Sequence, residues 1–113
     1  MRRVFRMPVS AVYPHYVTKV ERKGRTTDEL DEAIGWLTGY DGPALHAHLD
    51  AGTTFEDFFA GAHLHPHAAR ITGVVCGVRV EDIEDPLTQQ IRYLDKLVDE
   101  LAQGRPMTKV LRT

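Results

Sequence analysis

The stretch from Asp85 to Gly104 constrains the fold more than any other part of the sequence. Asp85 is a favoured N-cap residue, Pro86 suits a first helical position, and Gly104 is typical of a helix exit. Between them, apolar side chains recur at helical spacing: Leu87, Ile91, Leu94, Val98 and Leu101. We therefore predict a helix over Pro86–Gln103, and its apolar stripe requires the rest of the chain to cover it.

Two capping boxes predict further short helices. Thr26 and Glu29 form the first, in which a hydroxyl and a carboxylate each accept a hydrogen bond from a free backbone N–H group. The apolar residues that follow have helical spacing and end at Gly39. Thr53 and Glu56 form the second box, ahead of an aromatic run.

Proline and glycine residues predict two more helices. Pro14 suits the first position of one helix, because its missing N–H would be unpaired there, and Gly24 suits the exit. Asp41 and Pro43 open the other helix, which closes near Gly52.

The valine-rich segment Ile71–Val80 fits either a helix or a buried strand. We predict a helix, because an isolated strand would leave its backbone groups without partners. The alternative is a strand that pairs with the arm Val4–Met7.

The predicted fold class is all-α, a single compact domain over residues 1–113 with five or six short helices. An α+β fold with a small two-stranded pairing is the alternative.

Length and composition exclude several classes of protein. The chain has 113 residues, of which 42% are hydrophobic, enough for one core and too apolar for disorder. It has no apolar run that could span a membrane, and Met7 and Pro8 interrupt any signal peptide. The single cysteine, Cys76, excludes an intrachain disulfide and fits a reducing compartment. We expect a cytoplasmic protein without a membrane partner.

Charge is distributed unevenly along the chain. Residues 1–25 carry seven basic side chains and one acid, whereas residues 26–62 carry eight acids and no Lys or Arg. A basic arm could contact nucleic acid or an acidic partner. Alternatively, the basic ends pair with the acidic middle within one fold or across a homodimer. A pI of about 6.3 favours pairing and makes nucleic acid the weaker prediction.

The histidines form two clusters, His46–His48 and His63–His67. Imidazole suits zinc, copper and nickel, but a competent site needs three or four ligands at suitable spacing. No Cys-x-x-Cys or His-Glu-x-x-His pattern accompanies them. The spacing therefore favours adventitious metal binding, and we predict no metal site and no cofactor.

Four residues are candidates for ligand binding. Cys76 could act as a thiol nucleophile, since Arg79 could favour its thiolate form. Its valine neighbours instead favour a buried, inert thiol. Trp36 and Tyr40 lie four positions apart and could form an aromatic ligand wall, although packing at the core margin is the better explanation of both.

Several motifs resemble a family of small bacterial proteins known as domain-of-unknown-function family 2200. The likeness spans nearly the whole chain and is strongest at Gly73–Glu81. The motifs that carry it are Val12–Pro14, Lys23–Thr26, Trp36–Tyr40, Phe55–Phe59, Gly73–Glu81, Ile83–Leu87 and Ile91–Leu97. The resemblance implies a bacterial, cytoplasmic, stand-alone domain, and it implies no reaction, cofactor or catalytic residue. The run His63–His67 is not part of the family pattern.

The sequence leads to three functional hypotheses. The first is a small helical interaction module, self-associating or bound to a protein partner, without chemistry of its own. The second is a small-molecule-binding protein or thiol-dependent enzyme, with a pocket near Trp36, Tyr40, Cys76 and Arg79. The third is a weak nucleic-acid binder that uses the basic N-terminal segment. The absence of a phosphate loop or nucleophile elbow favours the non-enzymatic interpretation, and we predict no catalytic residues.

Overall fold

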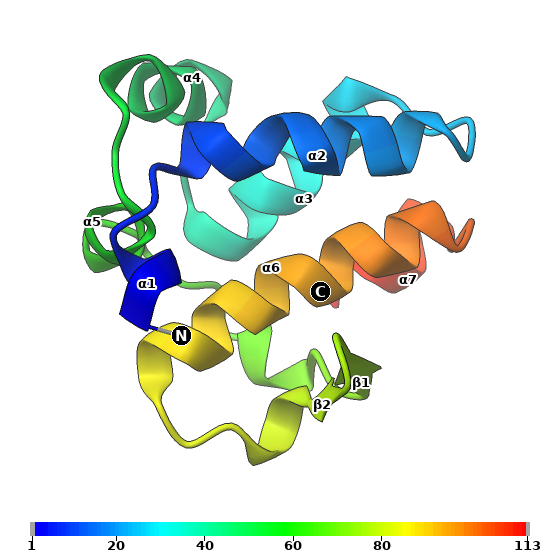
Figure 1. The fold of residues 1–113 in the computed structure, drawn as a ribbon. Helices are drawn as coiled ribbons and strands as arrows, with labels where there is room; N and C mark the ends of the chain where they lie inside the picture. Colours follow the sequence, from blue (N-terminus) through cyan, green and yellow to red (C-terminus); the bar gives the residue numbers. More distant parts are fainter. Residues whose placement is uncertain (1, 113) are drawn as a thin grey trace.

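Short helices surround one long central helix in the computed structural model, which describes residues 2–112 (Figure 1). Met1 and Thr113, the ends of the predicted domain, lie outside the described residues. The elements are α1 (Arg2–Phe5), α2 (Val9–Glu21), α3 (Thr27–Thr38), α4 (Gly42–Ala51), α5 (Phe55–Ala60), η1 (Ala68–Arg70), β1 (Val74–Val75), β2 (Val78–Arg79), η2 (Val80–Asp82), α6 (Pro86–Ala102) and α7 (Met107–Val110). The predicted helical fold class is confirmed. Seven α-helices are found in this range instead of five or six, because α1 and α7 are single turns that the sequence does not mark.

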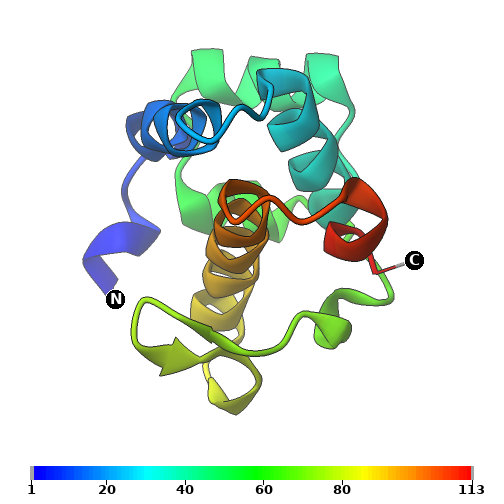
Figure 2. The same cartoon turned by 90° about the vertical axis from the view of Figure 1, so that its right-hand side faces the viewer.

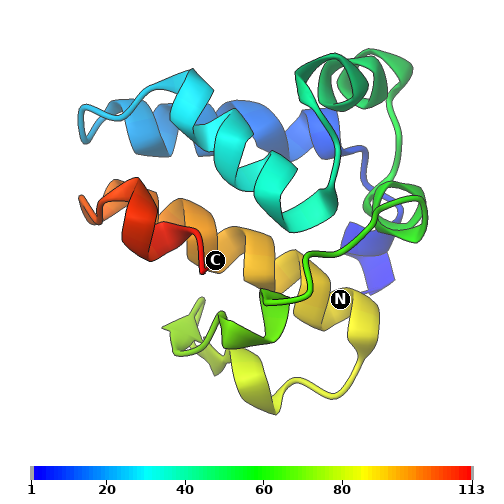
Figure 3. The same ribbon diagram turned by 180° about the vertical axis from the view of Figure 1, so that it is seen from behind.

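Helix α6 is the centre of the fold, as the sequence predicts. Asp85 caps it by accepting a hydrogen bond from the Thr88 N–H at 2.9 Å. Helices α2, α3 and α4 lie on one side of α6, and the β1–β2 hairpin lies on the other (Figures 1 and 2). Seen from behind, α7 folds back beside the C-terminal end of α6 (Figure 3). The buried residues of α6 are Ile91, Tyr93, Leu94, Leu97, Val98, Glu100 and Leu101.

Helix α2 begins earlier than Pro14 predicts. It starts at Val9, so Pro14 lies inside the helix on its exposed side. The preceding arm is held by an antiparallel bridge between Pro8 and Thr54. The Val9 N–H also donates to the Thr53 carbonyl at 2.9 Å. These non-local bonds fix the start of the helix, and they outweigh the proline signal.

The other helix boundaries follow their local signals closely. Both hydrogen bonds of the Thr26–Glu29 capping box are present, at 3.0 and 3.1 Å. Gly39 ends α3 with a positive φ of 79°. The second predicted box does not form: Thr54 rather than Thr53 caps α5, and its hydroxyl accepts a hydrogen bond from the Asp57 N–H.

The predicted helix over Ile71–Val80 is wrong. This segment is an antiparallel hairpin in which Val74 pairs with Arg79 and Val75 pairs with Val78. Its two-residue turn places Cys76 and Gly77 at φ values of 52° and 77°, as a tight hairpin turn requires. The alternative predicted a two-stranded pairing correctly but assigned the wrong partner, since the strand pairs within its own segment and not with the N-terminal arm.

Candidate functional site: a basic groove and an adjoining cleft

A basic groove lies between α2 and α6. It has a volume of about 710 Å³ and is open to solvent. The residues that line it are His15, Thr18, Lys19, Arg22 and Lys23 on one side and Asp99, Ala102 and Gln103 on the other. Lys19, Arg22 and Lys23 give this groove three fixed positive charges against the single carboxylate of Asp99.

The helical repeat explains why these cations share one face. The inner stripe of α2, which includes Tyr16 and Val20, packs into the core. His15, Lys19 and Arg22 follow i, i+4, i+7 spacing and so form a neighbouring stripe. The sequence therefore contained the signal for this groove, but the partner helix that forms its other wall is not visible from the sequence.

The one carboxylate in the groove is already engaged. Asp99 accepts a hydrogen bond from Lys19 Nζ at 3.3 Å and one from Gln103 Nε2 at 2.9 Å. Arg22 and Lys23 are exposed, and within residues 2–112 neither side chain forms an ion pair. Two cations in the groove are thus available to an anionic ligand.

A smaller cleft of about 220 Å³ adjoins the groove, and His15 and Lys19 line both. Its other lining residues are Tyr16, Val75, Cys76, Asp95 and Val98. The cleft is formed where the hairpin lies against α2 and α6. Its walls are mainly apolar, in contrast to those of the groove.

A hydrogen bond at the base of the cleft joins α2 to α6. The Tyr16 hydroxyl donates to Asp95 Oδ1 at 2.6 Å, and Arg92 donates to Asp95 Oδ2 at 2.9 Å. Burial, followed by the adjacent Asp95 carboxylate, raises the pKa of the Tyr16 hydroxyl well above its usual value. Tyr16 therefore stays neutral and acts as a donor.

The expected burial of Cys76 is wrong. Its thiol is free and its residue exposed, because it occupies the hairpin turn. The predicted neighbour, Arg79, lies on β2 with its guanidinium 3.8 Å from the Glu81 carboxylate, and it does not line the cleft.

Trp36 and Tyr40 lie elsewhere. Trp36 stacks on His65 with ring centroids 4.2 Å apart, and its buried indole N–H has no acceptor among the described residues. The Tyr40 hydroxyl donates to the Phe58 carbonyl at 2.6 Å. Neither the basic groove nor the cleft is lined by Trp36 or Tyr40, so these two hollows do not bring the four predicted ligand residues together.

A third groove, of about 480 Å³, lies between α3 and α4 and is acidic. Its lining includes Asp28, Asp31, Glu32 and Asp41. Asp31 accepts a hydrogen bond from the Tyr13 hydroxyl at 2.6 Å and lies 3.1 Å from His46 Nε2. The molecule therefore has one basic and one acidic groove, formed by different pairs of helices.

The second histidine cluster is part of the packing. His65 Nδ1 accepts a hydrogen bond from the His67 backbone N–H at 2.9 Å, and His67 Nδ1 lies 2.9 Å from the Arg112 carbonyl oxygen. Burial lowers the pKa of His65, and the nearby His67 and Arg70 lower it further. In the part of the chain that the structure describes, no three His, Cys, Asp or Glu side chains are placed to hold a metal ion.

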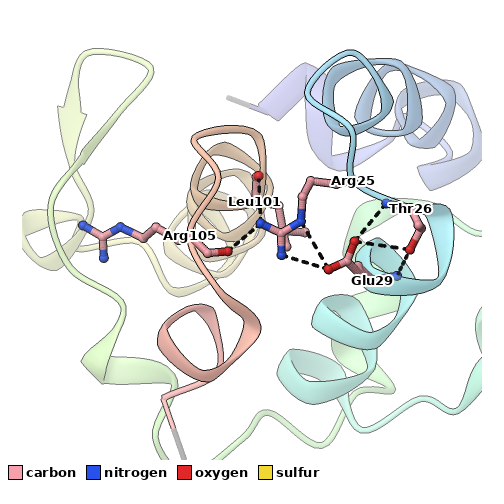
Figure 4. A network of polar contacts seen from close by, with 5 residues as sticks. All are labelled: Arg25, Thr26, Glu29, Leu101 and Arg105. Carbon is pink, nitrogen blue, oxygen red and sulfur yellow. Dashed lines mark hydrogen bonds and ion pairs between the residues drawn. The ribbon is translucent and has the colours of Figure 1, made fainter.

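Several basic residues pair with acids inside the fold. Arg25 lies between α3 and the C-terminal end of α6, where its Nε and Nη2 donate to Glu29 Oε2 at 3.2 and 3.0 Å (Figure 4). Its Nη1 donates to the carbonyls of Leu101 at 3.4 Å and Arg105 at 2.5 Å (Figure 4). Charge pairing within one fold therefore accounts for part of the asymmetry; the Arg2 side chain lies outside the described residues.

Glu100 is a buried acid that the sequence analysis missed. Its spacing from Lys96 predicts a surface ion pair, yet Glu100 is only 1% exposed, and Lys96 Nζ donates instead to the Val74 carbonyl. Both Glu100 oxygens accept hydrogen bonds from Arg112, each at 2.6 Å. The sequence did not identify Arg112 as the partner of Glu100, because a turn and helix α7 separate the two residues along the chain.

The fold and its grooves define a small helical protein with one hairpin and a charged surface. None of its described helices is long and apolar enough to cross a membrane. The family model for uncharacterized proteins conserved in bacteria (DUF2200) matches residues 3–112, so the chain belongs to this family, as its motifs predicted. The chain is also similar to the uncharacterized protein SP1917, whose crystal structure it matches at 45% identity and a TM-score of 0.92. That match covers 98% of this chain and 92% of the other. No curated protein matches it.

Proposed function

We propose that the protein is an interaction module that binds an acidic segment of a partner protein in the α2–α6 groove. The observation that carries this proposal is the cluster of Lys19, Arg22 and Lys23 on one wall of an open groove. The Arg22 and Lys23 side chains make no ion pair within residues 2–112, so their charges are available to a partner.

The charge pattern favours an acidic protein segment over nucleic acid. A nucleic-acid backbone presents charge at every nucleotide and suits a long cationic track. Here the cations Lys19, Arg22 and Lys23 are confined to the C-terminal end of α2 and the two residues that follow it, and Asp99 faces them from α6. A second copy of this chain is one source of acidic segments, since its α3–α4 groove has the complementary charge, and self-association remains a prediction.

The test is a binding titration with a fluorescent, glutamate-rich peptide that has a central serine (the serine peptide). In the double variant Arg22→Gln/Lys23→Gln we expect affinity to fall about tenfold, because two exposed charge contacts together contribute about 1.4 kcal/mol. The matched control is Arg70→Gln/Lys109→Gln, which removes the same charge from exposed residues outside the groove.

The control should bind the serine peptide with the same affinity as the parent protein. Added salt should lower the affinity of both the parent protein and the control for this peptide. Equal losses in the two double variants, or no binding by the parent protein at low salt, would contradict the proposal. Light scattering at the same protein concentrations reports whether a second copy is the partner.

A further inference from the structure

The cleft beside the groove suggests a more specific partner. His15 and Lys19 line both hollows, so the groove and the cleft are neighbours along one face of α2. From the groove to the cleft the lining changes from lysine and arginine to valine, cysteine and the ring of Tyr16.

Tyr16 and Asp95, two polar residues of the cleft, are already hydrogen-bonded. The Tyr16 hydroxyl donates to Asp95, and Arg92 donates to the other oxygen of the same carboxylate. These two groups therefore offer a ligand little unmet hydrogen-bonding capacity. The Asp95 carboxylate also repels acidic groups, so an acid is directed to the groove and an apolar group to the cleft.

The hairpin also carries exposed apolar side chains. Val75 and Cys76 line the cleft, while Val74 and Val78 of the same hairpin are 50% and 40% exposed. These two valines are among the few large hydrophobic residues exposed in the described structure. Apolar surface of this kind next to a charged rim is typical of a site that binds protein.

We propose that the partner segment places an apolar side chain in the cleft and adjacent carboxylates on Arg22 and Lys23. The proposal rests on the proposed function, since the carboxylates occupy the same groove. The cleft volume of about 220 Å³ accommodates one aliphatic side chain. The charges set the orientation of the segment, and the apolar side chain adds affinity that depends little on salt.

The first test compares the serine peptide with a peptide in which leucine replaces the serine (the leucine peptide). We expect the leucine peptide to bind about tenfold more tightly, because partial burial of one leucine side chain contributes about 1.4 kcal/mol. The Arg22→Gln/Lys23→Gln variant should bind both peptides more weakly by the same factor, so the tenfold ratio between the two affinities should stay unchanged.

The second test uses Cys76 as a reporter in the unmodified protein. The thiol lines the cleft and is exposed, so a bound leucine side chain should shield it. At saturation the leucine peptide should slow the reaction of Cys76 with an aromatic disulfide reagent about tenfold or more, as followed by the coloured thiolate that the reaction releases. The serine peptide should leave the rate nearly unchanged.

Alkylation of Cys76 with a maleimide provides the reverse experiment. The added group blocks the cleft and should abolish the advantage of the leucine peptide, while the serine peptide still binds. Cys76→Ser is the matched control, because it removes the thiol without adding bulk and should keep the advantage. Unchanged circular dichroism establishes that the alkylated protein stays folded.

The outcomes separate the two proposals. If neither peptide binds, the proposed function fails and this inference fails with it. If both bind equally and neither protects Cys76, the groove binds acids and the inference about the cleft is wrong. If a single-stranded oligonucleotide binds more tightly than the leucine peptide and protects Cys76 as well, the partner is nucleic acid and the inference is overturned.

Discussion

At the scale of single residues, His65 attaches the loop that follows α5 to helix α3. Its ring stacks on Trp36 of α3, and its Nδ1 atom accepts the His67 backbone N–H. Its own backbone N–H donates to the Leu37 carbonyl at 3.0 Å, near the end of α3. An accepting Nδ1 requires a neutral ring, which agrees with the lowered pKa of His65.

The lowered pKa of His65 predicts how stability depends on pH. The unfolded chain protonates this ring near its ordinary pKa of 6.5, whereas the folded protein protonates it at a lower pH. The stabilisation from neutral His65 is therefore complete above pH 6.5 and is lost as the pH falls through 6.5 toward the folded pKa. Urea unfolding of the parent protein and of His65→Gln across this window checks it. The loss of stability with falling pH should be smaller in the variant, and parallel curves would contradict the assignment.

At the scale of elements, the helix boundaries that could be predicted are those set by neighbours in sequence. Thr26 and Glu29 meet within one turn, and Gly39 needs only its own backbone freedom, so both signals were sufficient. Pro14 predicted the wrong start for α2, because that start depends on a bridge to Thr54, which is distant in the sequence. Local signals fail where a distant segment supplies the hydrogen bonds.

The hairpin and the groove show the same limit. In Ile71–Val80 the valines fit a helical and an extended period equally well, and the deciding feature is the turn at Cys76–Gly77. Cysteine is not a typical residue for a positive φ, so the turn had no sequence signal beyond Gly77. For the groove, the cations of α2 were visible in the sequence, but Asp99 on the opposite wall was not recognisable as their neighbour.

Two glycines with the same backbone conformation should differ in what they tolerate. Gly24 and Gly39 have φ values of 78° and 79°, but a side chain at Gly24 would enter open space. A Cβ atom at Gly39 would lie 3.1 Å from the His63 carbonyl oxygen. It would displace the segment whose His63 N–H donates to the Thr38 carbonyl at 2.8 Å.

We therefore expect Gly24→Ala to lower the free energy of unfolding by about 1 kcal/mol, the cost of a left-handed alanine. Gly39→Ala should cost about 2 kcal/mol or more, because it adds the loss of a backbone hydrogen bond. Urea denaturation of the two variants measures the difference. Equal costs would mean that the His63 segment yields to the added methyl group without losing its bond to α3.

At the scale of the whole molecule, Arg112 connects the end of the chain to the central helix. Its guanidinium holds both oxygens of buried Glu100, and its carbonyl oxygen lies 2.9 Å from His67 Nδ1. Val110, two residues earlier, is completely buried. The C-terminal segment is thus part of the core, and the hydrophobic cluster that it joins includes residues from α2 through α7.

Loss of Arg112 should therefore destabilise the molecule as a unit. Arg112→Met leaves the Glu100 carboxylate buried without its main cation, and we expect the free energy of unfolding to fall by about 3 kcal/mol. Arg105, whose guanidinium is 3.9 Å away and exposed, can compensate only slightly. Because the core is continuous, Trp36 fluorescence and far-ultraviolet circular dichroism should report the same, lower urea midpoint.

The double variant Glu100→Leu/Arg112→Met distinguishes the cost of an unpaired Glu100 carboxylate from the loss of other contacts that attach the C-terminal segment. Replacing both partners with apolar side chains removes the unpaired carboxylate, and stability should return to within about 1 kcal/mol of the parent protein. If the double variant is no more stable than Arg112→Met, then contacts other than charge attach the C-terminal segment. If fluorescence and dichroism give different midpoints in Arg112→Met, the C-terminal segment unfolds separately and the core is not one cooperative unit.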